Sequence, residues 1–372
     1  MFRLNCKTMA ELVNKKFKLT AQVLTPLHIG SGAEKDWVAG VDYISKDGML
    51  WHLDMNRMVA AGVNMDMLAS MFATGKTDGV EKLIGAKLKD VSDFQMRLPV
   101  SSANPIKVFL RNQLSNNPVL AGSSLKGAIR SVLFTDMREH KETRNEDVFG
   151  KLKDGADFMR FIRVGDIEFP HDATRLVNTK IYNLQKIGSE WQGSWKHGAN
   201  FTNADYNPVG FNTLYECLIP GKTAEGTIGF EASLFDKQQG LIAYQTKKHR
   251  VLNDVNALCE IIRDHTFDYL DKELDFFEQY EQGEYSPEIF NSIVEIQEAI
   301  NACHPNECII KMSAGAGFHS ITGDWQFDDY VHGTLDRKRN RGNDVKPKSR
   351  KIAIWGQKMS LMGFVKLTFT EE

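Results

Sequence analysis

The stretch from Gly122 to Arg130 combines the residue types that proteins use to hold a phosphate. A glycine precedes two serines, and apolar residues at three-and-four spacing then predict an amphipathic helix. Backbone N–H groups at a helix start lack helical partners, and two cations lie four residues apart on a neighbouring face. The alternative is an ordinary surface helix capped by one of the serines. The candidate phosphate contacts are Ser123, Ser124, Lys126, Gly127 and Arg130.

Two further glycine-rich turns follow predicted strands, at residues 26–32 and 313–323. None of the three turns matches a P-loop or a dinucleotide-binding fingerprint. Each turn by itself is compatible with a simple tight turn, but three at strand ends fit an extended polyanion lying across the ends of a sheet. The candidate contacts in these two turns are His28, Gly30, Ser31, Gly32, Gly315, Gly317 and His319.

The strongest charge feature is residues 337–351, with eight basic residues and a single acidic one, in a chain of net charge −2. It lies between two predicted strands, so a solvated loop is the alternative to phosphate contact. The contacts expected there are Arg337, Lys338, Arg339 and Arg341.

Catalysis has weaker support. His28 and His319 could act as the general base and acid of a metal-independent RNA cleavage, but a histidine beside a turn is more often structural. Cys303 and Cys308 are the only cysteines close in sequence, and zinc normally needs four ligands. We therefore expect no enzyme activity, no metal and no cofactor.

Strands and helices alternate along the chain in a way that predicts an α+β fold. A split β-α-β unit used twice is the most economical architecture. Strands are expected at 17–25, 41–45, 49–54, 161–169, 179–185, 215–222, 227–234, 308–312, 352–355 and 363–369. Of these, 41–54 and 215–234 are expected to be hairpins. Helices are expected at 56–72, 123–137, 247–282 and 286–302, and an irregular loop at 189–208.

The totals set outer bounds. A length of 372 residues allows two domains, and 42% hydrophobic with 25% charged residues is ordinary for a globular protein. No signal-peptide core or membrane-length apolar run is present, and five scattered cysteines fit reduced thiols. We expect a cytoplasmic protein without membrane contact.

Four motifs together resemble the RAMP superfamily of CRISPR proteins. They are residues 25–32, 122–130, 164–166 and 315–320. The motif order, the chain length and the closing stretch 362–367 are most similar to the type III-A (Csm) effector subunit that caps the 3′ end of the crRNA. The resemblance implies two tandem ferredoxin-like (RRM-like) domains, 1–214 with an insertion at about 65–117 and 215–372 with a helical insertion at about 247–302.

The same resemblance implies a function. The chain would be a crRNA-binding structural subunit of a type III-A ribonucleoprotein in antiviral defence, supporting 3′-end maturation and assembly without a nuclease site of its own. Implied partners are single-stranded crRNA and other Csm subunits, especially the repeated backbone subunit, with target RNA and host nucleases as further candidates. The backbone subunit is usually shorter and carries a target-cleaving aspartate, for which no equivalent can be placed here. The alternative is a metal-independent crRNA-processing endoribonuclease using His28 and His319.

Overall fold

The first predicted strand forms the middle of a sheet. In β1, alternate residues Phe17, Leu19, Ala21 and Val23 are buried, as the alternating pattern predicts. β1 pairs antiparallel with β11 on one side and with β15 on the other. The described strands of this first sheet, from one edge to the other, are β12 (Glu307–Lys311), β15 (Phe364–Glu371), β1 (Lys15–Val23), β11 (Thr223–Phe230) and β6 (Ile162–Val164).

The structure is a computed structural model that describes residues 14–101, 104–139, 142, 144–196, 212–237, 246–280, 287–312, 314–317, 320 and 348–372. His319 and the basic candidates Arg337, Lys338, Arg339 and Arg341 lie outside these ranges. No helix within them combines the length and apolar composition that a membrane span requires.

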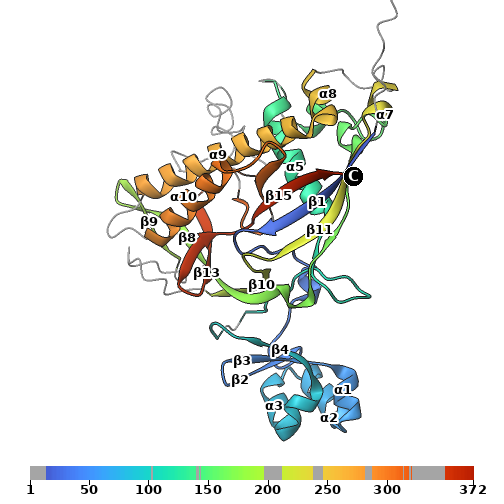
Figure 1. The fold of residues 1–372 in the computed structure, drawn as a ribbon. Coiled ribbons are helices and arrows are strands. Elements are labelled where there is room, and N and C mark those ends of the chain that lie inside the picture. The colour runs from blue at the N-terminus through green and yellow to red at the C-terminus, as the bar shows by residue number, and fades with distance from the viewer. Residues whose placement is uncertain are drawn as a thin grey trace, which may run out of the picture.

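Helices cover one face of the first sheet (Figure 1). α5 (Gly122–Met137) connects β1 to β6, and α9 (Val255–Tyr280) follows β11. Along the chain the strands of this sheet and its two helices come in the order β1, α5, β6, β11, α9, β12 and β15, with other elements between them. The apolar stripe of α5, including Leu125, Ile129 and Leu133, is buried against this sheet as predicted. The α+β fold class is confirmed.

A second antiparallel sheet lies beside the first. Its described strands are β10 (Thr213–Leu218), β8 (Thr174–Ile187), β13 (Ser349–Trp355) and β14 (Lys358–Leu361), with β9 (Glu190–Trp195) paired to β8. The second half of α9 and α10 (Pro287–Asn301) pack on it through a core that includes Tyr182, Trp195, Phe276 and Ile293. α9 therefore contributes to the cores of both sheets.

A small lobe projects from the body (Figure 1). It contains β2 (Tyr43–Lys46), β3 (Met49–Leu53), β4 (Ser92–Arg97), α1 (Met55–Ala60), α2 (Met65–Ala73), α3 (Val80–Ile84) and α4 (Leu88–Val91), around a core of its own. Asp47 and Gly48, both at positive φ, form the turn of the predicted hairpin. The lobe overlaps the insertion predicted at about 65–117, which stays a prediction.

Short elements complete the described chain: β5 (Val119–Leu120), β7 (Ile167–Glu168), α6 (Asn145–Phe149), α7 (Ala232–Lys237) and α8 (Thr246–Asn253). Each of the two large sheets combines strands from both sides of residues 214 and 215. The domain boundary placed there stays a prediction.

Several local expectations were wrong. The expected hairpin 215–234 does not form, because its strands join different sheets: β10 pairs with β8, and β11 pairs with β1 and β6. Residues 190–195, expected in an irregular loop, form β9.

Two helices expected to be continuous are each divided. The helix expected at 247–282 breaks at Asp254, whose carboxylate accepts a hydrogen bond from the Asn256 N–H at 2.9 Å and so caps α9. The helix expected at 56–72 divides at Gly62, which has positive φ, before Asn64 caps α2.

One lysine is buried in the first sheet. Lys311 on β12 is 4% exposed, and its Nζ donates to the Met362 carbonyl at 2.6 Å beneath the Phe364 ring. Burial lowers its pKa to about 7, with Glu273 opposing the shift and Arg350 adding to it.

We expect Lys311→Met to change the pH dependence of stability. In the unfolded chain Lys311 keeps its proton up to its ordinary pKa of about 10.4, whereas in the fold it loses it near pH 7. Between these values the unfolded state binds more protons, so the free energy of unfolding rises with pH by up to about 1.4 kcal/mol per unit. In denaturant unfolding between pH 7.5 and 9.5, the free energy of unfolding should rise more steeply with pH for wild type than for Lys311→Met. Equal slopes would contradict this prediction.

The start of α5 approaches the β6–β7 connection closely. A Cβ on Gly122 would overlap the carbonyl oxygens of Val164 and Gly165, whereas a Cβ on Gly127 would meet nothing. We expect Gly122→Ala to destabilise the fold by about 1–3 kcal/mol through overpacking. The matched control Gly127→Ala should be neutral or stabilising by up to about 1 kcal/mol, because alanine favours helix. Thermal melting of the two variants compares them directly; a stable Gly122→Ala would show that the contact can relax.

Candidate nucleic-acid interface

The fold brings the first and last glycine-rich turns together. The Ala314 N–H donates to the His28 carbonyl at 3.1 Å, and the Gly363 N–H donates to the Pro26 carbonyl at 3.0 Å. Gly32, Gly315 and Gly317 have positive φ, which explains glycine at these positions. The described residues of the two turns, far apart in sequence, therefore lie side by side at His28 and Ala314, and we treat them as one candidate surface.

The side chain of His28 lies beneath this candidate surface. Its side chain is buried, with ring centroids 4.8 Å from Tyr215 and 6.0 Å from Phe109. Its Nδ1 lies 2.7 Å from the Glu216 carbonyl, and burial lowers its pKa despite that hydrogen bond. The ring is thus placed to support the turn from within, and contact of RNA with the turn's backbone stays a prediction.

An extended segment, residues 106–111, lies beside the first turn. Leu110 donates to the Ile29 carbonyl at 2.8 Å, and both the N–H and the hydroxyl of Ser31 donate to the Val108 carbonyl. No strand was predicted for this segment, although its alternation of apolar residues with Lys107 and Arg111 is typical of one.

Two lysines outside the predicted set of site residues flank the joined turns. Lys107 is paired with Asp36, and its side chain is 38% exposed. Lys351 lies over the Tyr215 ring, donates to the Tyr215 hydroxyl, and comes next to Gly315. In the sequence, Lys351 stands out only as the end of the basic stretch.

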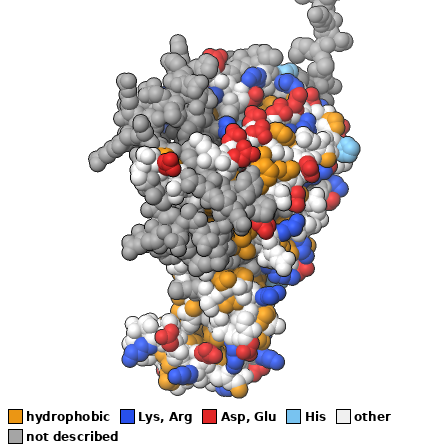
Figure 2. Space-filling view, turned by 90° about the vertical axis from the view of Figure 1, so that its left-hand side faces the viewer, with side chains coloured by type: hydrophobic (Ala, Val, Ile, Leu, Met, Phe, Trp, Pro, Cys, Tyr) orange, Lys and Arg blue, Asp and Glu red, His pale blue; other side chains and the backbone are white. Residues whose placement is uncertain are grey.

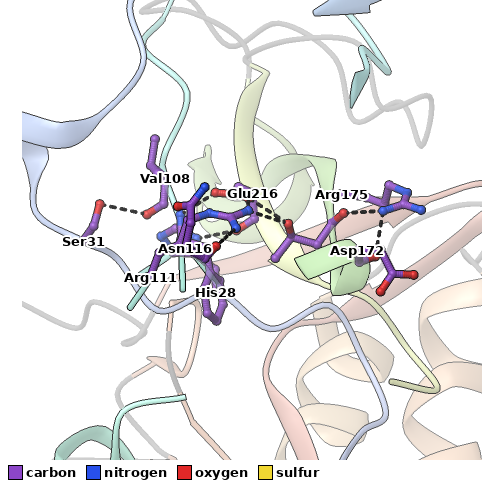
Figure 3. A network of polar contacts seen from close by, with 10 residues as sticks. His28, Ser31, Val108, Arg111, Asn116, Asp172, Arg175 and Glu216 are labelled. Carbon is purple, nitrogen blue, oxygen red and sulfur yellow. Dashed lines mark hydrogen bonds and ion pairs between the residues drawn. The ribbon is translucent and has the colours of Figure 1, made fainter. Parts of the chain in front are cut away.

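A buried carboxylate connects the segments beneath this surface (Figure 3). Glu216 on β10 is fully buried and accepts hydrogen bonds from the Phe109 N–H at 2.9 Å and the Thr174 hydroxyl at 2.8 Å. It also pairs with the Arg111 guanidinium, which donates to the Asn116 carbonyl at 2.7 Å. We call Glu216, Arg111 and Thr174 the Glu216 cluster. No sequence motif indicated it.

The start of α5 differs from the predicted phosphate site. Ala121 occupies the N-cap position without a side-chain cap, so neither Ser123 nor Ser124 caps the helix. The Gly122 N–H donates to the Asp166 carboxylate at 2.7 Å, so a protein anion already contacts this helix start. The extended residues before it adjoin the 106–111 segment, because the Val119 N–H donates to the Leu110 carbonyl.

The two cations of α5 have different surroundings. Arg130 pairs with Asp157 at 3.0 Å and lies over the Phe149 ring, which are contacts within the protein. Lys126 is half-buried, and desolvation lowers its pKa, partly offset by Asp157. Lys126 therefore remains the better candidate for a phosphate contact at this site.

The outer face of α9 and α10 has the opposite charge. Exposed acidic residues line both helices: Glu260, Asp264, Asp268, Asp271, Asp275, Glu278, Glu288, Glu295 and Glu298. Acidic side chains also gather on the upper body in Figure 2. Desolvation and the neighbouring Glu260 raise the pKa of Asp264. This face disfavours phosphate groups.

Metal binding has no support in the described part of the chain. No group of three His, Cys, Asp or Glu residues there could hold a metal ion. Cys308 is buried and its thiol pKa is raised by burial, while Cys303 is half-buried.

Comparison with known proteins gives the family. A sequence model of the RAMP superfamily matches residues 20–272. No curated protein matches the chain. Two solved structures share its fold at 17% sequence identity. One is a chain of a Csm-crRNA-target RNA ternary complex of a type III-A CRISPR-Cas system, with a TM-score of 0.67, covering 95% of this chain and 100% of that one.

The other is Csm5 of T. onnurineus, with a TM-score of 0.58, covering 93% of this chain and 99% of that one. At this identity the two structures show a shared fold. The family match covers more than half of the residues, including the first turn and the start of α5. The chain therefore belongs to the RAMP superfamily.

Proposed function

We propose that this chain is a crRNA-binding structural subunit of a type III-A effector complex, and that it caps the 3′ end of the crRNA. The observation that carries the proposal is the junction of the two glycine-rich turns, through the hydrogen bond from Ala314 to His28, with Lys107 and Lys351 beside them. Glycine backbone without side chains allows close approach of a phosphodiester chain, and the lysines supply compact positive charge.

The two matched structures support the proposed binding partners. One matched chain belongs to a complex of Csm subunits with crRNA and target RNA, and the other is a Csm5 protein. The match over nearly the full length of both chains makes crRNA, other Csm subunits and target RNA the proposed partners. In this proposal the chain supports 3′-end maturation and complex assembly.

We propose further that the chain has no nuclease activity. A general acid or base must reach the reacting group, but the His28 ring is 4% exposed and packed between two aromatic rings. Its lowered pKa also reduces the protonated fraction near neutral pH.

The division into two ferredoxin-like domains is also a proposal. The first sheet with α5 and α9 provides one such unit. The return to strands at β10 supports a second unit. Each unit would then contain strands from both sides of residues 214 and 215, because each large sheet does.

Photo-crosslinking in the assembled complex tests the 3′-end position. A crRNA with 4-thiouridine at its 3′-terminal nucleotides should crosslink to this chain. A crRNA of the same length with 4-thiouridine near its 5′ end should not. Crosslinks from the 5′ end alone, or from neither end, would contradict the proposed position.

The double variant Lys107→Ser with Lys351→Ser tests the phosphate contacts. We expect weaker binding of single-stranded RNA and a log–log salt slope reduced by about 0.7 for each phosphate that no longer meets a lysine. Lys82→Ser with Lys89→Ser, on exposed positions of the small lobe, removes the same charge and should have a much smaller effect. Fluorescence anisotropy over a salt series measures both. An equal slope in the two double variants would assign the effect to net charge alone.

A further inference from the structure

The Glu216 cluster contains no proposed RNA contact, yet its hydrogen bonds lead to the two glycine-rich turns. A fully buried carboxylate is costly unless it is paired and hydrogen-bonded. Both Glu216 oxygens have partners: one accepts from the Phe109 N–H, and the other from Thr174 and Arg111. The carboxylate therefore joins β10 to two other segments: residues 106–111, through Phe109 and Arg111, and the start of β8, through Thr174.

The contacts run from the carboxylate to the surface in short steps. The Glu216 carboxylate accepts a hydrogen bond from the Phe109 N–H, and Phe109 forms an antiparallel β-bridge with Gly30. The neighbouring Val108 carbonyl accepts a hydrogen bond from the Ser31 N–H. The Glu216 N–H donates to the Lys107 carbonyl at 2.8 Å, which fixes the backbone of a proposed phosphate contact.

The backbone of Glu216 reaches the last turn as well. Its carbonyl lies 2.7 Å from Nδ1 of His28, and the His28 carbonyl accepts from the Ala314 N–H at 3.1 Å. One residue on β10 is thus connected to both glycine-rich turns and to Lys107.

We infer that Glu216, together with Arg111, is a positioning residue that holds the two glycine-rich turns and Lys107 in the geometry that binds RNA. The inference rests on the proposed function, since it explains how that surface is kept in place. Glu216 does not touch the RNA; it acts through Phe109, His28 and the backbone of residues 107–111.

The test compares Glu216→Gln with wild type. The amide keeps the size of the side chain but removes the charge that Arg111 pairs with. We expect RNA affinity to fall by about tenfold and the salt slope to decrease by about 0.7, because Lys107 is no longer held in place and one phosphate contact is lost. Arg111→Lys is the second variant: it retains the positive charge but cannot form the forked interaction with Glu216, Thr174 and Asn116.

Ile293→Ala is the control for reduced stability. Ile293 lies on α10, in the core of the second sheet, and its truncation lowers the melting temperature without touching the cluster. RNA binding measured well below the melting temperature should be retained in this control and reduced in Glu216→Gln and Arg111→Lys. If all three variants melt earlier and bind RNA equally well, Glu216 is merely structural and the inference is overturned.

Hydrogen exchange without RNA supplies a separate readout. The backbone N–H groups of Ser31, Leu110 and Ala314 each donate to a carbonyl of another of the connected segments. Their exchange should accelerate in Glu216→Gln and remain unchanged in Ile293→Ala. Unchanged exchange in Glu216→Gln would overturn the inference. Wild-type protein that binds no RNA would overturn the proposed function and the inference together, whereas wild-type binding with undiminished variant affinity overturns the inference alone.

Discussion

The pairing of β1 with strands from two distant parts of the chain is the constraint on which the rest of the structure depends. Because neighbouring strands are antiparallel, the end of β1 lies beside the start of β15, and the start of β15 lies beside the end of β12. The turns that follow β1 and β12 therefore begin at the same end of the sheet. The register of one sheet thus brings together the two glycine-rich turns that the proposed RNA interface needs.

Buried charges fix the elements that the sheets alone leave adjustable. Glu216 holds the 106–111 segment against β10, and the buried pair of Arg350 with Glu273 holds β13 against α9. Such pairs are weak contributors to net stability, but removing one partner leaves a charge uncompensated. They penalise alternative placements of the loops around them, which suits the proposed RNA-binding surface.

Charge is also distributed by face. Lys107 and Lys351 lie near the two turns, whereas α9 and α10 carry many exposed acidic residues. A net charge of −2 is therefore compatible with a local RNA-binding surface, although Glu34 and Asp36 follow the first turn and Asp36 pairs with Lys107. The same division leaves the helical face to solvent or to protein surfaces of opposite charge.

The sequence by itself determined the features that depend on nearest neighbours. Alternation in β1, the Asp47-Gly48 turn and the apolar stripe of α5 follow from backbone periodicity and φ preferences, which a short window contains. Motif order was enough to indicate the superfamily. Only the tertiary structure decided that β10 and β11 join different sheets, that Arg130 faces Asp157, and that Glu216 pairs with Arg111. The two ion pairs join residues 27 and 105 positions apart, and β11 pairs with β1 from Lys15 with Phe230 to Gln22 with Thr223. A cation's pattern in sequence is the same whether it meets a buried carboxylate or a phosphate.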